Sequence, residues 1–122
     1  MAKILLVEDD PFLSTLLKNH LEKEGMSVGL AKDGEEAIAF LRANKFDLIL
    51  LDIILPKKSG FELLEEIRQD PELEKVQVII ISNLGQPEDV ARGQKLGAIE
   101  YFIKTKTSID ELMLKIKQIL TK

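Results

Sequence analysis

Leu48-Ile49-Leu50-Leu51-Asp52-Ile53-Ile54 is the stretch of sequence that decides the fold. Its first four residues form an unbroken aliphatic run, which is typical of a strand buried on both faces inside a parallel sheet. The carboxylate of Asp52 follows directly and is therefore expected at the C-terminal end of that strand. Ligands of open α/β sheets bind in the crevice outside these strand ends. Asp52 is thus the first candidate for an active group.

Shorter apolar runs on either side of this stretch alternate with helix signals. Strands are predicted over residues 4–7, 28–31, 46–51, 78–81 and 101–103. Helices are predicted over residues 11–24 and 88–96, and after the capping-box pairs Asp33 with Glu36, Ser59 with Glu62, and Ser108 with Glu111. Alternation of this kind predicts an α/β fold: a doubly wound parallel sheet of five strands with helices on both faces.

The composition is that expected of one soluble globular domain spanning residues 1–122, with 45% hydrophobic and 31% charged residues. No apolar run approaches the roughly 18 residues that a membrane-spanning helix needs. The chain contains no cysteine, which excludes disulfides and thiolate metal sites and is compatible with a cytoplasmic location. The net charge of −4 and the scattered lysines argue against nucleic-acid binding by this chain.

Polar side chains follow four of the predicted strands: Glu8 and Asp9, Asp52, Ser82, and Lys104. Because the C-terminal ends of parallel strands meet at one edge of the sheet, these side chains are expected to converge. Clustered carboxylates repel one another, and a hard divalent cation such as Mg²⁺ would supply the counter-charge. Carboxylates, Mg²⁺, a lysine and a hydroxyl are the groups that stabilise a transferring phosphoryl group, with an aspartate as nucleophile.

A family resemblance rests on five motifs in order: Val7-Glu8-Asp9-Asp10, Leu51-Asp52-Ile53-Ile54-Leu55-Pro56, Gly60, Ile81-Ser82 and Ile103-Lys104. At these spacings the chain resembles the receiver domain of a two-component response regulator, like the single-domain chemotaxis regulators, from about residue 3 to residue 120. The resemblance implies a flavodoxin-like (βα)₅ fold with strand order 2-1-3-4-5. It also implies a phosphoacceptor switch in place of an enzyme.

The resemblance further implies how the acceptor and its metal are held. Asp52 would accept a phosphoryl group from a phosphohistidine on a sensor histidine kinase or a histidine phosphotransfer protein. Asp9, Asp52 and the backbone carbonyl of Ile54 would bind Mg²⁺, for which Mn²⁺ would substitute. Glu8 would bind the ion through water.

The remaining implied roles concern the response to phosphorylation. Lys104 would pair with Asp52 or its phosphate, Ser82 would turn inward to bond a phosphoryl oxygen, and Tyr101 would pack inward with it. The fourth helix, fifth strand and fifth helix would form the reporting face. This face would control a downstream effector protein or an output domain missing from this chain, or would form a homodimer on phosphorylation.

Two departures from the family pattern have predicted consequences. Thr105 replaces the usual proline after Lys104, so the peptide between them is expected to be trans, with residues 105–107 reshaped, because a non-proline cis bond costs about 3 kcal/mol. Ile54 and Leu84 occupy positions that flank the path of the hydrolysing water in the family. Apolar side chains there cannot orient that water, which predicts slow self-dephosphorylation.

Four further polar residues near these motifs have simpler interpretations. Asp10 is predicted to cap the first helix. His20, the only histidine, is predicted to pack against the sheet, so that the donor histidine comes from another protein. Lys57 and Lys58 are predicted to lie in a solvated loop.

Three other functions remain as alternatives. A degenerate receiver would serve as a phosphorylation-independent interaction module. A Mg²⁺-dependent aspartyl phosphatase of the haloacid-dehalogenase type would need a second aspartate where Ile54 stands. A flavodoxin-type flavin carrier would need a Ser/Thr/Gly-rich phosphate loop where the chain has Glu8-Asp9-Asp10-Pro11, and negative charge there would repel a phosphate.

Overall fold

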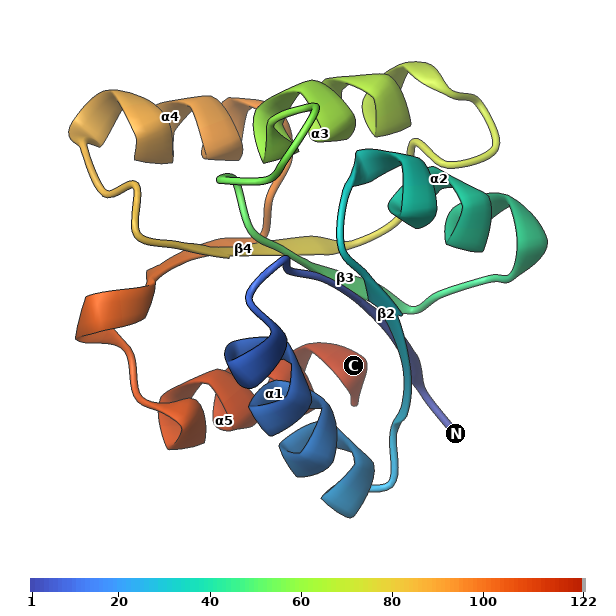
Figure 1. Cartoon of the computed structure of the whole chain (residues 1–122), viewed down its shortest axis with the longest axis vertical. Coiled ribbons are helices and arrows are strands. Elements are labelled where there is room, and N and C mark those ends of the chain that lie inside the picture. The colour runs from blue at the N-terminus through green and yellow to red at the C-terminus, as the bar shows by residue number, and fades with distance from the viewer. Residues whose placement is uncertain (122) are drawn as a thin grey trace.

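A five-stranded parallel sheet lies between two layers of helices in the computed structural model, which describes residues 1–121 (Figure 1). The strands are β1 (Lys3–Val7), β2 (Ser27–Ala31), β3 (Leu48–Leu51), β4 (Val78–Ser82) and β5 (Glu100–Ile103). They lie in the order β2-β1-β3-β4-β5, with every neighbouring pair parallel. This confirms the predicted doubly wound fold and the strand order that the resemblance implied.

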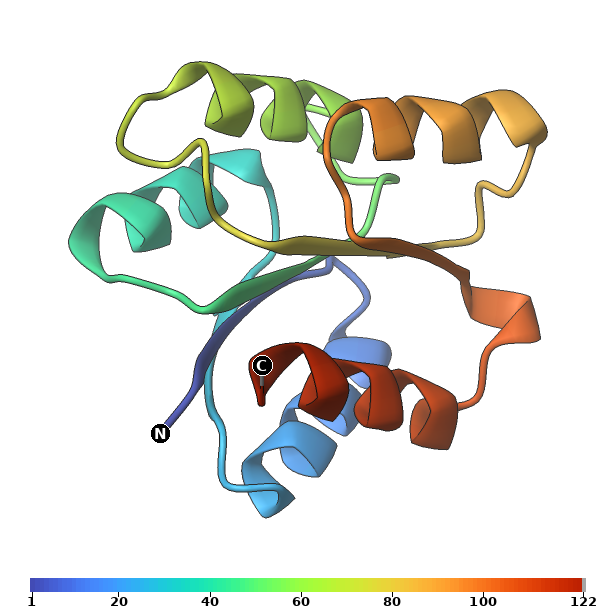
Figure 2. The ribbon, with the colours of Figure 1, turned by 180° about the vertical axis from the view of Figure 1, so that it is seen from behind.

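The helices divide between the two faces of the sheet. They are α1 (Pro11–Lys23), α2 (Gly34–Ala43), α3 (Gly60–Gln69), α4 (Pro87–Lys95) and α5 (Ile109–Leu120), with a 3₁₀ turn η1 (Lys104–Lys106) before α5. Figures 1 and 2 show α1 and α5 on one face and α2, α3 and α4 on the other. Within residues 1–121, no helix is both long and apolar enough to cross a membrane.

The central strand explains why this sequence forms a two-sided sheet. All four residues of β3 are completely buried. Ile49 and Leu51 pack into the core on the α2 and α3 side, whereas Leu48 and Leu50 pack into the core on the α1 and α5 side. Successive side chains of a strand point to opposite faces, so an unbroken aliphatic run fills both cores. Asp52 therefore follows directly on a strand that is packed on both faces.

The helix caps follow the sequence with one correction. Ser59 and Ser108 form complete capping boxes with Glu62 and Glu111. Asp33 caps α2 by accepting from the Glu36 N–H at 2.9 Å. The reciprocal half of that predicted box is wrong, because Glu36 Oε1 accepts from the N–H of Lys32 at 2.9 Å. Because the backbone of Asp33 is nearly extended (φ −153°, ψ 177°), the N–H of Lys32 faces the Glu36 carboxylate.

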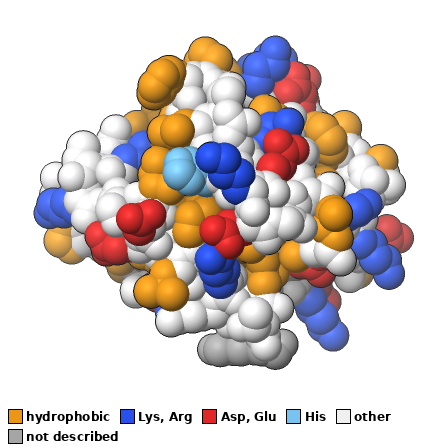
Figure 3. Space-filling model, turned by 90° about the horizontal axis from the view of Figure 1, so that it is seen from below, with side chains coloured by type: hydrophobic (Ala, Val, Ile, Leu, Met, Phe, Trp, Pro, Cys, Tyr) orange, Lys and Arg blue, Asp and Glu red, His pale blue; other side chains and the backbone are white. Residues whose placement is uncertain are grey.

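The interpretation of His20 as packed against the sheet is also wrong. The side of α1 that faces the sheet carries Ser14, Leu17 and Leu21, which are buried, whereas His20 is only half-buried. It lies at the edge of that apolar stripe because helical rotation places Leu21, not His20, nearly in line with Leu17. The view onto the α1 and α5 face shows the histidine ring at the surface (Figure 3).

Candidate functional site

Three carboxylates meet where β1 and β3 end. Val7 of β1 lies opposite Leu51 of β3, so the next residues, Glu8 and Asp52, leave the sheet side by side. One carboxylate oxygen each from Glu8, Asp9 and Asp52 lie within 4.8 Å of one another. Glu8 and Asp52 are each 3% exposed, whereas Asp9 is exposed. The predicted convergence of these acids is present, with two buried carboxylates below one that reaches solvent.

Lys104, the first residue after β5, inserts its ammonium group between the two buried acids. Its Nζ lies 2.8 Å from Asp52 Oδ2 and 2.7 Å from Glu8 Oε1. Burial lowers the pKa of Lys104, but the hydrogen bonds and charges of Asp52 and Glu8 outweigh burial and raise it, so the lysine stays charged. The Asp52 pair was expected from the resemblance. The pair between Lys104 and Glu8 was not expected. The presence of one lysine beside two acids at this edge could have indicated it.

Glu8 carries the least satisfied oxygen of the cluster. Burial, the largest cause, and the charge of Asp52 raise its pKa to about 7, against the opposing effects of Lys104 and the Asp10 N–H. Oε2 accepts from the Asp10 N–H at 3.1 Å. In the part of the chain that the structure describes, the one partner of Oε1 is the Lys104 ammonium 2.7 Å away, whose orientation falls short of a well-formed hydrogen bond. An under-satisfied buried oxygen beside two more carboxylates fits a hard divalent cation, which takes oxygen ligands.

Asp52 is held by donors on both of its oxygens. Oδ1 accepts from the Ile54 N–H at 3.2 Å, and Oδ2 accepts from Lys104. The start of α3 lies against the backbone next to Asp52, because the Gly60 N–H donates to the Ile53 carbonyl at 2.8 Å. A Cβ at position 60 would lie 2.3 Å from the carbonyl oxygen of Asp52 itself. Gly60 belongs to the sequence motif, but the sequence did not explain why a glycine is needed there. The explanation is that the backbone of Asp52 lies too close to position 60 for a side chain to fit.

Ser82 and Tyr101 contact the same residue in the β4–α4 loop. Ser82 is completely buried at the end of β4, and its Oγ accepts from the Leu84 N–H at 3.3 Å. The Tyr101 hydroxyl donates to the Leu84 carbonyl. The two residues expected to act as switches therefore bond the same residue, Ser82 at its N–H and Tyr101 at its carbonyl, a connection that the sequence did not indicate.

The pKa of Tyr101 gives a direct test of this half-buried, hydrogen-bonded position. Burial, followed by the negative charges of Asp89 and Asp52, raises the pKa of its phenol to about 12 from the ordinary value of 10.0. Tyr101 is the only tyrosine and the chain has no tryptophan, so ultraviolet absorbance reports this one ionisation. We expect native protein to ionise near pH 12 and urea-unfolded protein near pH 10.

The same shift affects stability with a definite sign. Between these two pKa values the folded state holds more protons than the unfolded state, so the stability that Tyr101 contributes is lost as the pH rises through this interval. The Tyr101→Phe variant should lack this part of the decline in unfolding free energy with rising pH. Ionisation of the native wild-type protein near the ordinary pKa of 10.0 would contradict this half-buried position.

The two departures from the family pattern are visible at this edge. No cis peptide bond occurs among residues 1–121, so the Lys104-Thr105 bond is trans as predicted. Residues 104–106 form the 3₁₀ turn η1. The side chain of Ile54 is 54% exposed and that of Leu84 is half-buried. Both apolar side chains follow strand ends that contribute to the site.

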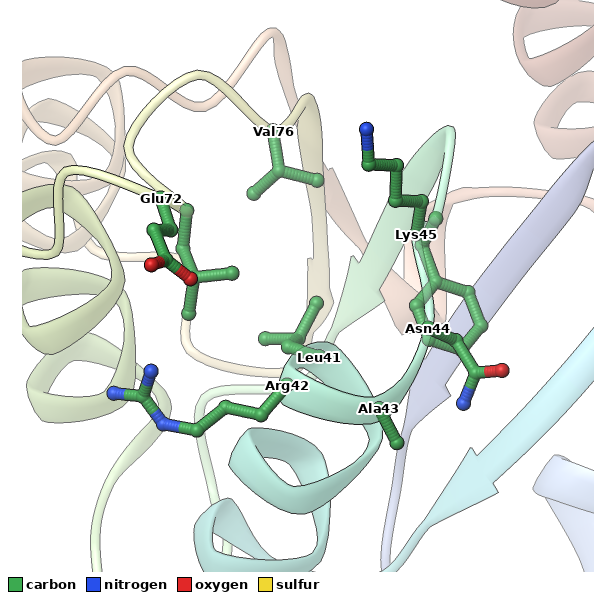
Figure 4. Close-up of a pocket in the computed structure, with 9 residues that line it drawn as sticks. Leu41, Arg42, Ala43, Asn44, Lys45, Glu72 and Val76 are labelled. Carbon is green, nitrogen blue, oxygen red and sulfur yellow. The ribbon is translucent and has the colours of Figure 1, made fainter.

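A separate hollow of the molecule lies away from these acids. A cavity of about 600 Å³ lies between the end of α2 and the segment that leads into β4, at the opposite edge of the sheet from the acids. Figure 4 shows Leu41 and Val76 in its wall, with Arg42, Lys45 and Glu72 around it. Arg42 is already paired with Asp70 at 2.7 Å. The chemistry therefore gathers at the carboxylate edge and not in this cavity.

Comparisons with known proteins agree with this geometry. The family profile described as "Response regulator receiver domain" matches residues 4–117. The chain is 39% identical over 120 residues to the phosphate regulon transcriptional regulatory protein PhoB of Rhizobium meliloti (strain 1021), covering 98% of this chain and 52% of that protein. It thus spans about half the length of this curated relative and of others like it.

Two solved structures are similar along most of the chain. A Francisella receiver domain, that of response regulator 1452, superposes with a TM-score of 0.90 at 31% identity and covers 100% of both chains. The Mn²⁺-bound form of response regulator Rcp1 has a TM-score of 0.82 at 32% identity, with 93% of this chain and 88% of that one covered. Together with the acidic edge, the profile and these relatives show that the chain belongs to the receiver domain family of two-component response regulators, which are phosphorylation-dependent signalling switches.

Proposed function

We propose that residues 1–122 form one receiver domain in which Asp52 accepts a phosphoryl group from a phosphohistidine of a sensor kinase or phosphotransfer protein. The observation that carries this proposal is the placement of the Lys104 ammonium between the buried carboxylates of Asp52 and Glu8. Such a cation neutralises the acceptor in the resting state and is in reach of the charge that arrives with a phosphoryl group.

The transfer step follows from the groups around Asp52. A carboxylate oxygen of Asp52 forms a bond to phosphorus, while the bond from phosphorus to the donor imidazole nitrogen breaks and its electron pair stays on the imidazole. Lys104 then exchanges its Asp52 contact for a phosphoryl oxygen. Mg²⁺ would be held by Asp9, Asp52 and the Ile54 carbonyl, with Glu8 reaching it through water, and it would neutralise charge on the transferring group. The Mn²⁺ in the Rcp1 structure supports a divalent ion here.

Leu84 would couple the phosphorylated site to the rest of the domain. When the Ser82 hydroxyl turns to a phosphoryl oxygen, it gives up the Leu84 N–H, and the Leu84 carbonyl is the acceptor of Tyr101. Movement of Leu84 would therefore release or reposition Tyr101 on β5. The face formed by α4, β5 and α5 would pass the change to a downstream protein, to an output domain beyond this chain, or to a second copy.

The donor would dock beside α1. Phe12, in the first turn of this helix, is 78% exposed and follows the cap Asp10. A hollow of about 150 Å³ lined by Leu13 and Ile109 reaches Lys104. An apolar surface next to the acceptor suits a partner that must bring its phosphohistidine to Asp52. We place this encounter in the cytoplasm, the location expected from the sequence.

The proposed function is tested by loading the protein with acetyl phosphate. With Mg²⁺ present, intact mass spectrometry should show the gain of one phosphoryl group in wild-type protein and none in Asp52→Ala. Omitting Mg²⁺ should remove most of the gain. Equal labelling of both proteins, or no gain in either, would favour the alternative of a phosphorylation-independent interaction module.

The lifetime of the phosphoryl group should be long. Ile54 and Leu84 present only apolar side chains, and these cannot hydrogen-bond the water that would attack the acyl phosphate. We expect Ile54→Asn with Leu84→Glu to release phosphate at least about tenfold faster, which is below the roughly 10²–10⁴-fold that a well-positioned acid or base group contributes. Phosphate release after loading measures this rate. If the double variant is no faster than wild type, the explanation fails.

A further inference from the structure

Lys57 adopts a strained backbone conformation in the loop that follows Asp52. Its φ of 70° makes it the single non-glycine residue with positive φ in the described part of the chain. The Lys58 N–H donates to the Pro56 carbonyl at 2.8 Å, which closes a three-residue turn around Lys57. A turn with this bond and a central φ near +75° is the classic γ-turn, a rare and strained form. Such strain persists only where surrounding contacts maintain it.

The side chain of Lys57 supplies such a contact. Its Nζ lies 3.5 Å from Asp33 Oδ2 and 3.6 Å from Glu35 Oε2, both at the start of α2. Asp33 is a fixed anchor because its carboxylate also accepts from the first turn of α2. The charges of Asp33 and Glu35 raise the pKa of Lys57, in keeping with a formed contact. Lys57 lies in an exposed loop, as predicted, and these ion pairs are contacts that the sequence did not indicate.

The rest of the loop is held at its ends. The Ile54 N–H donates to Asp52 Oδ1 at one end, and the Gly60 N–H donates to the Ile53 carbonyl at the other. Lys58 is also paired, with Glu66 of α3. Among residues 1–121, Lys57 alone joins the tip of the loop to the neighbouring β2–α2 segment by ion pairs.

We propose that Lys57 is a positioning residue that, through Asp33 and Glu35, keeps the strained turn closed and the Ile54 backbone beside Asp52. This inference rests on the proposed function, because Ile54 would contribute its carbonyl to the divalent ion. A loop already held in its binding geometry loses less conformational freedom when the ion arrives. Releasing Lys57 should therefore weaken ion binding without removing any ligand.

The effect should be modest and sensitive to salt. Exposed ion pairs are weak singly and are screened by salt. We expect Lys57→Gln to weaken Mg²⁺ binding about fivefold, the size that a pair of this kind permits, and to speed amide hydrogen exchange at Ile54 and Gly60 in metal-free protein by a similar factor. Both changes should shrink at high salt, and Lys57→Arg should largely restore wild-type behaviour.

Two further variants separate positioning from general stability. Lys58→Gln removes the same charge from the same loop at a residue with ordinary φ, and it should leave Mg²⁺ binding near the wild-type value. Lys57→Gly removes the ion pairs but relieves the strain, since glycine adopts positive φ without penalty. It should match or exceed wild type in thermal stability while still binding Mg²⁺ more weakly.

The readouts distinguish this inference from the proposed function. NMR titration with MgCl₂ gives the affinity, hydrogen exchange of metal-free protein reports the loop, and acetyl phosphate loading of wild type checks the acceptor. If wild type neither binds Mg²⁺ nor gains a phosphoryl group, the proposed function fails, and the exchange rates alone decide whether Lys57 holds the loop. Wild-type exchange rates in Lys57→Gln, or equal effects in Lys58→Gln, would overturn the inference.

Discussion

Lys104→Met protein is expected to lose about 3 kcal/mol of unfolding free energy near neutral pH in the absence of divalent ions, the lower end of the cost of removing one partner from a buried ion pair. The Lys104 side chain is 18% exposed, and those of its partners Glu8 and Asp52 are 1% and 4% exposed. Without the ammonium group, the two buried acids would lack their counter-charge, and either keeping both ionised or protonating Glu8 costs free energy. Urea unfolding in the presence of a chelator measures the loss.

Three comparisons make the Lys104 result specific. Mg²⁺ should recover part of the lost stability, because it would bind only the folded state and supply the missing positive charge. Adding Glu8→Gln to Lys104→Met should also recover part of it by removing one of the opposed charges. Lys106→Met, on the same 3₁₀ turn but exposed, is the matched control and should change little. Wild-type stability of Lys104→Met in chelator would contradict the prediction.

Gly60→Ala should destabilise the protein by about 3 kcal/mol, the upper range for forcing an added group into a packed site. Its Cβ would lie 2.3 Å from the Asp52 carbonyl oxygen and 2.7 Å from the Ile53 Cα. Both neighbours are backbone atoms, so neither can rotate away as a side chain could. Either α3 or the acceptor must move, and we expect acetyl phosphate labelling of Asp52 to slow as stability falls.

Gly34→Ala provides the matched control for Gly60→Ala. Both glycines are buried, and both are the first residue of a helix after a side-chain cap. A Cβ at Gly34 would meet the Cδ of Lys58 at 3.3 Å, near the end of a flexible side chain that can shift. Denaturant unfolding should therefore show a small change for Gly34→Ala. Equal losses in the two variants would show that the approach to Asp52 is not the cause.

The local features of this fold could be predicted because they depend on neighbouring residues. The aliphatic run before Asp52, the Asp10 cap of α1 and the capping boxes at Ser59 and Ser108 are all present where the sequence placed them. The errors are of one kind. Glu36 accepts from the N–H of Lys32 and not from that of Asp33, because packing sets the backbone angles near the cap. His20 lies at the edge of the apolar stripe of α1, because packing also sets the exact rotation of the helix.

What the sequence by itself determined is the class of fold and the gathering of its polar residues at one edge, since strand periodicity and parallel topology fix which residues end each strand. What only the tertiary structure decided is which of those groups share a partner. Lys104 lies between Asp52 and Glu8, Ser82 and Tyr101 meet on Leu84, and Gly60 closes on the Asp52 carbonyl. These contacts join segments far apart in the chain, and they depend on side-chain reach and loop return, which no local pattern of residues records.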